Sequence, residues 1–393
     1  MVKTASLFSQ ILSQINRHAF GSLARELKAE KGAKGFSCWD QFVAMLFCQL
    51  AQARSLREIE SGLKSCEGKL RHLGVEQAAK RSTLSYANAH RPWRLYEGVF
   101  YALLERVQAC APRKKFRFRN KLLSLDATVV ELCASMFDWA RYRATKGALK
   151  LHLLLDHDGC LPVYACITEG RVAELKVAWQ MQLPKGSIVV VDRGYVDYHL
   201  FQRWTEQGVF FVTRQKRNAA AVTVERFPVP EGRGAVRRDE LIVHQAFEAG
   251  AKARQVLRRV VVWVEEKQEE LVLLTNNFRL SAATIAAIYK ERWQIELFFK
   301  ALKQNLKIKT FVGTSANAVQ IQIWTALIAV LLVKLLQFSS SLKWALSNLI
   351  ALLRWNLFTY RDLWKWLNAP FDTPPLSAQE EQAWLDLDSI APT

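Results

Sequence analysis

The chain has 393 residues, half of them hydrophobic, which excludes a disordered polypeptide and suffices for two or three domains. Its 55 lysine and arginine residues against 36 aspartate and glutamate residues give a formal net charge of +19, which favours a polyanionic partner such as nucleic acid. Seven cysteines without a C-x-x-C pair indicate neither a disulfide framework nor a zinc site, and we expect free thiols in a reducing cytoplasm.

Residues 1–112 show helical periodicity and are predicted to form a helical N-terminal DNA-binding domain. A strongly apolar helix is expected over 36–53 with Ser37 as its N-cap, and a shorter helix begins after Ser55. Short helices joined by tight turns favour a helix-turn-helix, although a small helical bundle gives the same pattern.

The stretch RSTLSYANAHR at 81–91 predicts the last short helix of this region, capped by Ser82 or Thr83. It is polar and flanked by arginines, as a DNA-reading helix would be. In that interpretation Ser82, Ser85, Tyr86 and Asn88 face bases, and Arg81 and Arg91 face phosphates.

Strand periodicity replaces helical periodicity in residues 113–217, the first part of the predicted catalytic core. Strands are expected at 122–132, 149–156, 161–167, 187–192 and 209–213, and helices at 171–181 and 198–207. Asp126 lies within the first strand and Asp192 ends the fourth. Three strands, a helix, a strand, a helix and a strand follow the order of a ribonuclease-H-like α/β core.

The rest of the chain divides into three further segments. Residues 218–278 form a β-rich insertion with strands at 221–227, 240–246, 256–265 and 270–275. Residues 279–312 return to the core with one long helix over 281–309, and residues 313–393 form a C-terminal helical region and tail. The most apolar segment, 323–333, is shorter than the roughly 20 residues that span a bilayer, so we expect a core helix and no membrane partner.

A single carboxylate stands in a basic stripe of the expected core helix, in YKERWQIELFFKALK at 289–303. At about 100° per residue, Glu296 falls beside Tyr289, Arg292 and Lys303, and Lys300 lies on the same side. The remaining faces are apolar, which predicts a helix buried except along this stripe. The stripe suits a phosphodiester backbone with a metal ion above it, although an amphipathic helix with solvated charges shares the local pattern.

Asp126, Asp192 and Glu296 are three carboxylates in largely apolar surroundings. A buried carboxylate is costly unless a cation offsets its charge, and hard oxygen ligands suit Mg²⁺ or Mn²⁺. Two such ions about 4 Å apart promote in-line displacement at phosphorus. We expect Asp126 to be the shared ligand, with Asp192 and Glu296 each completing one site.

Rival carboxylates occur in the same three segments, namely Glu131, Asp197 and Glu291. Asp197 precedes an expected helix and suits an N-cap. Glu291 is about 140° from Glu296 on the helical wheel, and Glu131 lies well beyond Asp126. Asp126, Asp192 and Glu296 therefore remain the preferred catalytic carboxylates.

The spacing Y-x2-R-x3-E-x6-K in 289–303 resembles the signature of DDE transposases encoded by a large group of bacterial insertion sequences. LSLDATVV, KGALKLHLLLDHDG, VVVDRGYVD, FVTRQKRN and RSTLSYANAHRPWR resemble the same group, as does the β insertion, so nearly the whole chain is covered. The resemblance supports Asp126, Asp192 and Glu296 as the catalytic, metal-binding residues. It gives DNA-binding roles to Tyr289, Arg292, Lys300 and Lys303. This chain departs from the group in the segment TEGRVAELKV at 168–177, where relatives commonly carry a histidine in place of Ala173.

The resemblance implies a DNA transposase that cleaves element ends in a metal-dependent reaction and transfers the strand into target DNA by a cut-and-paste route. Its partners would be double-stranded DNA, namely terminal inverted repeats and target. A homodimer would hold two ends together in the synaptic complex, in a bacterial cytoplasm beside the nucleoid. The alternatives are a nuclease of the same fold without strand transfer, and an inactive DNA-binding remnant or repressor.

Overall fold

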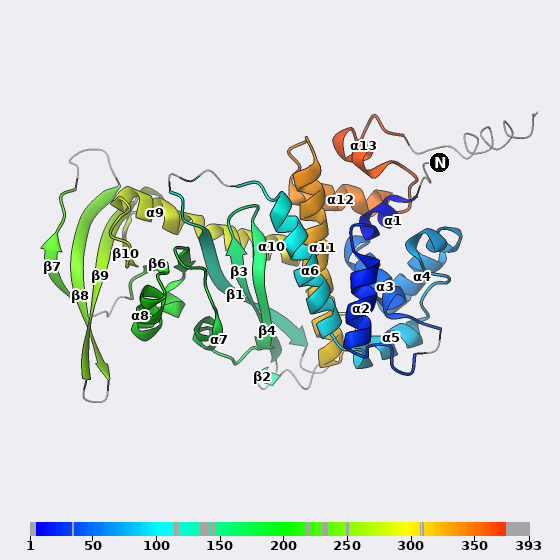
Figure 1. The fold of residues 1–393 in the computed structure, drawn as a ribbon, viewed down its shortest axis with the longest axis horizontal. Helices are drawn as coiled ribbons and strands as arrows, with labels where there is room; N and C mark the ends of the chain where they lie inside the picture. The colour runs from blue at the N-terminus through cyan, green and yellow to red at the C-terminus, as the bar shows by residue number, and fades with distance from the viewer. Residues whose placement is uncertain are drawn as a thin grey trace, which may run out of the picture. The chain divides into compact units, whose positions relative to one another are not determined.

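The computed structural model describes residues 5–33, 35–113, 116, 118–133, 141–143, 146–216, 221–229, 235–248, 251–306, 308 and 310–374. The chain forms two compact units (Figure 1). One combines Met1–Ala111 with Ala301–Thr393, and the other is Pro112–Lys300. The two ends of the chain, predicted as separate helical regions, therefore share one unit.

The unit Pro112–Lys300 is built on a mixed ten-stranded sheet with the order β2-β3-β1-β5-β6-β10-β9-β8-β7, and β4 pairs with β3. Its first six strands are β1 Leu122–Cys133, β2 Arg141–Arg143, β3 Lys146–Asp156, β4 Leu161–Glu169, β5 Ile188–Val191 and β6 Phe210–Arg214. β1 is antiparallel to β3 and parallel to β5, and β5 is parallel to β6. The path β4-β3-β1-β5-β6, with helices between its parallel strands, is ribonuclease-H-like, which confirms the predicted fold class.

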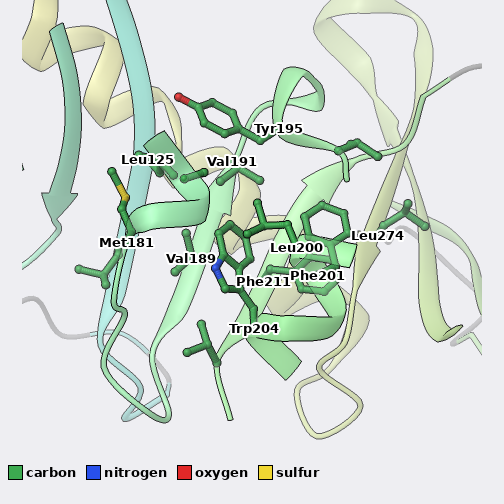
Figure 2. Packing of buried hydrophobic residues seen from close by; sticks show 14 of the residues in the cluster. Leu125, Met181, Val189, Val191, Tyr195, Leu200, Phe201, Trp204, Phe211 and Leu274 are labelled. Atoms are coloured by element: carbon green, nitrogen blue, oxygen red, sulfur yellow. The ribbon is translucent and has the colours of Figure 1, made fainter. Parts of the chain in front are cut away.

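The core strands β1 and β5 are covered on both faces, which explains why β5 is an uninterrupted apolar run. On one face, alternate residues of β1 and β5 pack against α7 Glu174–Gln180 and α8 Tyr198–Glu206. Figure 2 shows Val189 and Val191 of β5 beside Leu200 and Trp204 of α8. The intervening residues face α9 Ala282–Glu291 on the other side. Burial on both faces fixes the register, and with it the position where each strand ends.

The β-rich insertion continues this sheet and does not form a module of its own (Figure 1). Its strands are β7 Ala221–Arg226, β8 Val236–Glu248, β9 Ala251–Val264 and β10 Glu269–Thr275. All four were predicted, but β8 and β9 begin four and five residues earlier than expected. β10 joins the insertion to the core by pairing antiparallel with β6. Arg258 and Asp239 form a buried bidentate ion pair at 2.8 and 2.7 Å, and Arg258 also donates to the carbonyl oxygens of Asn277 and Leu280 ahead of α9.

The other unit is helical. Its α-helices are α1 Leu7–Leu12, α2 Arg17–Glu26, α3 Cys38–Leu50, α4 Leu56–Lys64, α5 Arg81–His90, α6 Arg94–Cys110, α11 Ala316–Ser339, α12 Leu346–Asn356 and α13 Leu363–Asn368. Ser37 and Ser55 cap α3 and α4 as predicted. α11 packs against α3, α5, α6 and α12. Among the described helices it alone is long and apolar enough to cross a bilayer, yet 89% of its most apolar window is buried in protein, as expected of a core helix.

Helix α5 corrects part of the predicted DNA-reading surface. It begins at Arg81 without a side-chain cap, so neither Ser82 nor Thr83 is the N-cap. Asn88 is buried and accepts a 2.8 Å hydrogen bond from Gln41, so it does not face bases. Arg91 donates to the main-chain oxygens of Phe36 and Ser37, so it is used inside the protein.

An exposed strip nevertheless remains on α5. Tyr86 is 68% exposed and its ring stacks on His90, with centroids 4.1 Å apart. Ser82, Ser85 and Arg81 are exposed as well. Asn88 and Arg91 therefore make contacts inside the protein. Contacts of Ser82, Ser85 and Tyr86 with bases, and of Arg81 with phosphates, stay predictions.

Candidate active site

The two aspartates lie at matching positions on neighbouring parallel strands. In the β1–β5 register Leu125 is opposite Val191, so Asp126 and Asp192 are the next residue of each strand. Adjacent strands are about 4.8 Å apart, which brings these positions together although they are far apart in sequence. Asp126 accepts a 2.8 Å hydrogen bond from the Ala127 N–H. Asp192 accepts one of 2.7 Å from the Arg193 N–H and caps the short helix η3 Arg193–Tyr195.

The third carboxylate is carried by a helix that is interrupted at Arg292. α9 ends at Glu291 and α10 spans Trp293–Asn305, so the expected single helix over 281–309 is wrong in detail. Arg292 keeps right-handed helical angles, φ −50° and ψ −32°. The Arg292 N–H bonds to the Tyr289 carbonyl and the Ile295 N–H bonds to the Arg292 carbonyl, both three residues back, as in a 3₁₀ turn. The chain therefore tightens for one turn before Glu296.

Arg292 connects two of the three predicted catalytic carboxylates. Its Nη2 is 2.6 Å from Oε1 of Glu296, and its Nη1 is 3.7 Å from Oδ2 of Asp126. The guanidinium also lies 5.9 Å from the centre of the Tyr289 ring. A planar guanidinium can bond to several acceptors at once, so Arg292 acts as an internal cation between a strand carboxylate and a helix carboxylate.

The electrostatic setting of Asp126 is unfavourable for its charged form. Burial raises the pKa of the Asp126 carboxyl to about 6, and the charges of Glu174 and Asp192 add to the increase. The Ala127 N–H and the Arg292 guanidinium oppose it but do not cancel it. A carboxyl with a pKa raised in this way is a candidate functional group, because its charged form is costly unless a cation compensates it.

Within the described residues, no three His, Cys, Asp or Glu side chains are grouped closely enough to hold a metal ion. Carboxylates repel one another without a cation, and here Arg292 already pairs with Asp126 and Glu296. The donors nevertheless suit a hard divalent cation, since all are carboxylate oxygens and the largely buried charge of Asp126 is not fully compensated. The residues present therefore fit a divalent metal by their chemistry.

The rival carboxylates have other partners or other positions. Asp197 caps α8 by accepting hydrogen bonds of 3.0 Å from the N–H groups of His199 and Leu200, which confirms the predicted role. Oε2 of Glu291 lies 3.8 Å from Nδ1 of His157. Glu131 is exposed further along β1. These contacts leave Asp126, Asp192 and Glu296 as the stronger candidates.

Sequence reasoning missed Glu174 and Tyr195. Glu174 is in the first turn of α7, and its Oε1 is 3.4 Å from Nζ of Lys150 on β3. A Cβ added to Gly194 would lie 3.8 Å from Oε2 of Glu174, so this carboxylate borders the segment that follows Asp192. Two signals could have indicated them: an acidic residue in the first turn of the helix after β4, and a tyrosine three residues after Asp192 in D-R-G-Y.

The predicted DNA-binding residues of the signature segment differ in their surroundings. Tyr289 is half-buried, and burial raises the pKa of its hydroxyl. Lys300 is exposed on α10. Lys303 is half-buried and belongs to the helical unit. Their contacts with DNA stay predictions, and Arg292 is the member of the set that already contacts the carboxylates.

A ribonuclease-H-like sheet with paired aspartates on its central parallel strands and a glutamate on a later helix is the architecture of the DDE class. Residues 117–332, more than half of the chain, match the family described as the transposase DDE domain. Residues 3–76 match a domain family of unknown function. The chain belongs to the DDE transposases of insertion sequences, a family that uses divalent metal ions and acts on DNA.

Curated relatives agree with this assignment. A putative transposase of Sinorhizobium fredii, y4zB, is 33% identical over 64% of this chain and 70% of its own length. A probable transposase of insertion sequence element IS5377 from Geobacillus stearothermophilus is 30% identical over 56% of this chain and 58% of that protein. A putative transposase of insertion sequence element IS4SA from Synechocystis is 25% identical over 65% of this chain and 71% of its own length.

The solved structures include a distant fold neighbour. A piggyBac transposase synaptic complex with hairpin DNA aligns with a TM-score of 0.45 and 10% identity, covering 98% of this chain and 84% of that one. A likeness at this level adds nothing to the assignment, which stands on the family match and the curated relatives.

Proposed function

We propose that this transposase cleaves DNA at the ends of its insertion element and joins the freed 3′-hydroxyl to target DNA, in a cut-and-paste route. Asp126, Asp192 and Glu296 would be its catalytic carboxylates. The observation that carries the proposal is geometric. Two aspartates occupy matching positions on neighbouring parallel strands, and Arg292 links one of them to Glu296.

The same carboxylates would hold two Mg²⁺ or Mn²⁺ ions, with Asp126 shared and Asp192 and Glu296 each completing one site. Bound ions would supply electrophilic stabilisation of the charge that develops at phosphorus. The protein's part is to fix the oxygen ligands. The backbone N–H groups of Ala127 and Arg193 hold the two aspartates, and Arg292 holds Glu296.

The DNA partners proposed are double-stranded terminal inverted repeats and target DNA. Tyr289, Arg292, Lys300 and Lys303 would contact phosphates, since Arg292 has donors beyond those used by its carboxylates. The net charge of +19 supports a polyanionic partner. A homodimer would hold two element ends, and a protein working on bacterial DNA would be cytoplasmic and beside the nucleoid.

The test uses the full chain and linear DNA that carries the inverted repeats flanking its gene. The wild-type protein should give Mg²⁺-dependent 3′-end cleavage and a joined product. Glu296→Gln should abolish both while keeping DNA affinity, because it removes one charge and no phosphate contact. Glu291→Gln is the matched control, since that residue lies on the same segment but contacts His157, and it should remain active.

The outcomes separate the candidate functions. Cutting without a joined product would identify a nuclease of the same fold. DNA binding that weakens with salt and yields no metal-dependent product would identify an inactive remnant or repressor. Undiminished cleavage by Glu296→Gln would exclude the assignment of that residue.

A further inference from the structure

The hydroxyl of Tyr195 is a buried polar group for which the proposed reaction has no role. Tyr195 ends η3, three residues after Asp192, and is 1% exposed. In the part of the chain that the structure describes, its oxygen has no hydrogen-bond partner. A buried hydroxyl without a partner loses its hydrogen bonds to water and gains none inside the protein. This costs free energy, so such a group needs an explanation.

The ring and the oxygen of Tyr195 are in different surroundings. The ring belongs to the apolar cluster that includes Leu125 and Val191. Figure 2 shows it at the edge of that cluster, with its oxygen directed away from Leu200 and Trp204. Leu125 and Val191 are the residues immediately before the two catalytic aspartates. The oxygen is therefore at the end of the strands where the carboxylates begin.

Three carboxylates act on this hydroxyl. Burial raises its pKa, and the charges of Asp126, Glu174 and Asp192 raise it further. Charges have this effect when they lie close to a group inside the protein. Glu174 is fixed on this side by Lys150, and its Oε2 would be 3.8 Å from a Cβ on Gly194, the residue before Tyr195. The hydroxyl of Tyr195 is thus a hydrogen-bond donor within the electrostatic influence of three carboxylates, and among the described residues it bonds to none of them.

We infer that Tyr195 is a positioning residue of the catalytic centre, whose hydroxyl donates its one hydrogen bond to a carboxylate of the group Asp126, Asp192 and Glu174 when these gather around a divalent cation. The inference rests on the proposed function and deepens it. A cation draws carboxylates together, and a donor on a ring held by apolar packing fixes their orientation. Glu174 becomes the fourth acidic residue of the centre.

The experiment compares Tyr195→Phe with wild type in the full chain, using Mn²⁺ alone as the probe. Thermal unfolding in EDTA measures the metal-free protein, and the electron paramagnetic resonance signal of free Mn²⁺ measures affinity. Tyr195→Phe keeps the ring and removes only the unpaired hydroxyl, so the melting temperature in EDTA should rise. The Mn²⁺ dissociation constant should increase about tenfold, because a hydrogen bond to a charged group is lost.

Tyr96→Phe is the matched control. Tyr96 on α6 is also 1% exposed and has an oxygen without a hydrogen-bond partner among the described residues, but no carboxylate acts on it. This variant should raise the melting temperature in EDTA and leave Mn²⁺ affinity unchanged. Equal Mn²⁺ affinity of Tyr195→Phe and wild type would overturn the inference. So would a lower melting temperature of Tyr195→Phe in EDTA, because the hydroxyl would then already be paired.

A further variant separates failure of the inference from failure of the proposed function. Asp126→Asn should lose Mn²⁺ binding if the proposed site is right. If Asp126→Asn binds Mn²⁺ as wild type does, or if wild type does not bind it, the proposed metal site fails and the inference with it. If Asp126→Asn loses binding while Tyr195→Phe keeps it, only the role of Tyr195 is rejected.

Discussion

Replacing Asp126 by asparagine should stabilise the metal-free protein at neutral and alkaline pH. Burial raises the pKa of this carboxyl from 3.8 to about 6, so the folded state binds its proton more tightly than the unfolded state does. The side chain is 19% exposed, so solvent screens it little. Above the folded pKa the group must be charged, and a shift of about two units then costs about 3 kcal/mol at about 1.36 kcal/mol per unit.

The sign of the effect follows from proton binding. Well below the unfolded pKa both states are protonated and the penalty vanishes; it grows as the pH rises from the unfolded pKa of 3.8 to the folded pKa of about 6, and it is constant above that. The amide introduced by Asp126→Asn would resemble the neutral carboxyl. The variant should therefore exceed wild type by about 2–3 kcal/mol at about pH 8 and by about 0.5 kcal/mol at about pH 4.

Urea unfolding in EDTA, followed by the β-sheet circular dichroism signal, measures both values. Glu131→Gln is the control, since it removes an exposed carboxylate of the same strand and should change stability by less than about 0.5 kcal/mol. A variant at Asp126 that is less stable than wild type at about pH 8, or whose advantage does not change with pH, would refute the argument that this carboxylate is strained.

Further predictions concern the same site and the two units. Because protons compete for Asp126, Mn²⁺ should bind about tenfold more weakly at about pH 5 than at about pH 8 in titrations of the full chain. Asn88→Ala should cost about 1–3 kcal/mol in unfolding experiments, because Gln41 loses its acceptor, and should leave DNA affinity in gel-shift assays unchanged. Arg258→Met should leave Asp239 buried without its partner and cost about 3–5 kcal/mol, seen as a lower urea midpoint; a midpoint equal to wild type would show that the pair contributes nothing.

The contact of Arg292 with Asp126 and Glu296 changes the interpretation of the signature segment. From sequence, Arg292 suits a phosphate contact alone. In the structure it also neutralises two carboxylates that would otherwise repel each other. A divalent cation bound by the same carboxylates would compete with Arg292 for their oxygens.

The sequence by itself determined the elements whose causes are local. Alternating and uninterrupted apolar runs defined the core strands, and Ser37, Ser55 and Asp197 cap their helices where expected. The spacing around Glu296 and the two strand-borne aspartates identified the family, because these motifs depend on short stretches of chain. The helical propensity of 281–309 was also visible, but not its tightening at Arg292, which accompanies an ion pair with a distant strand.

Only the tertiary structure decided which distant groups meet. The pairing of β1 with β5 places Asp126 next to Asp192, and the pairing of β10 with β6 turns the insertion into part of the core sheet. Burial removed Asn88 from the DNA-reading surface, and it left the hydroxyl of Tyr195 without a hydrogen-bond partner among the described residues. The physical reason is the same in each case: hydrogen-bond registers and packing faces join segments far apart in sequence, and no local pattern records the partner.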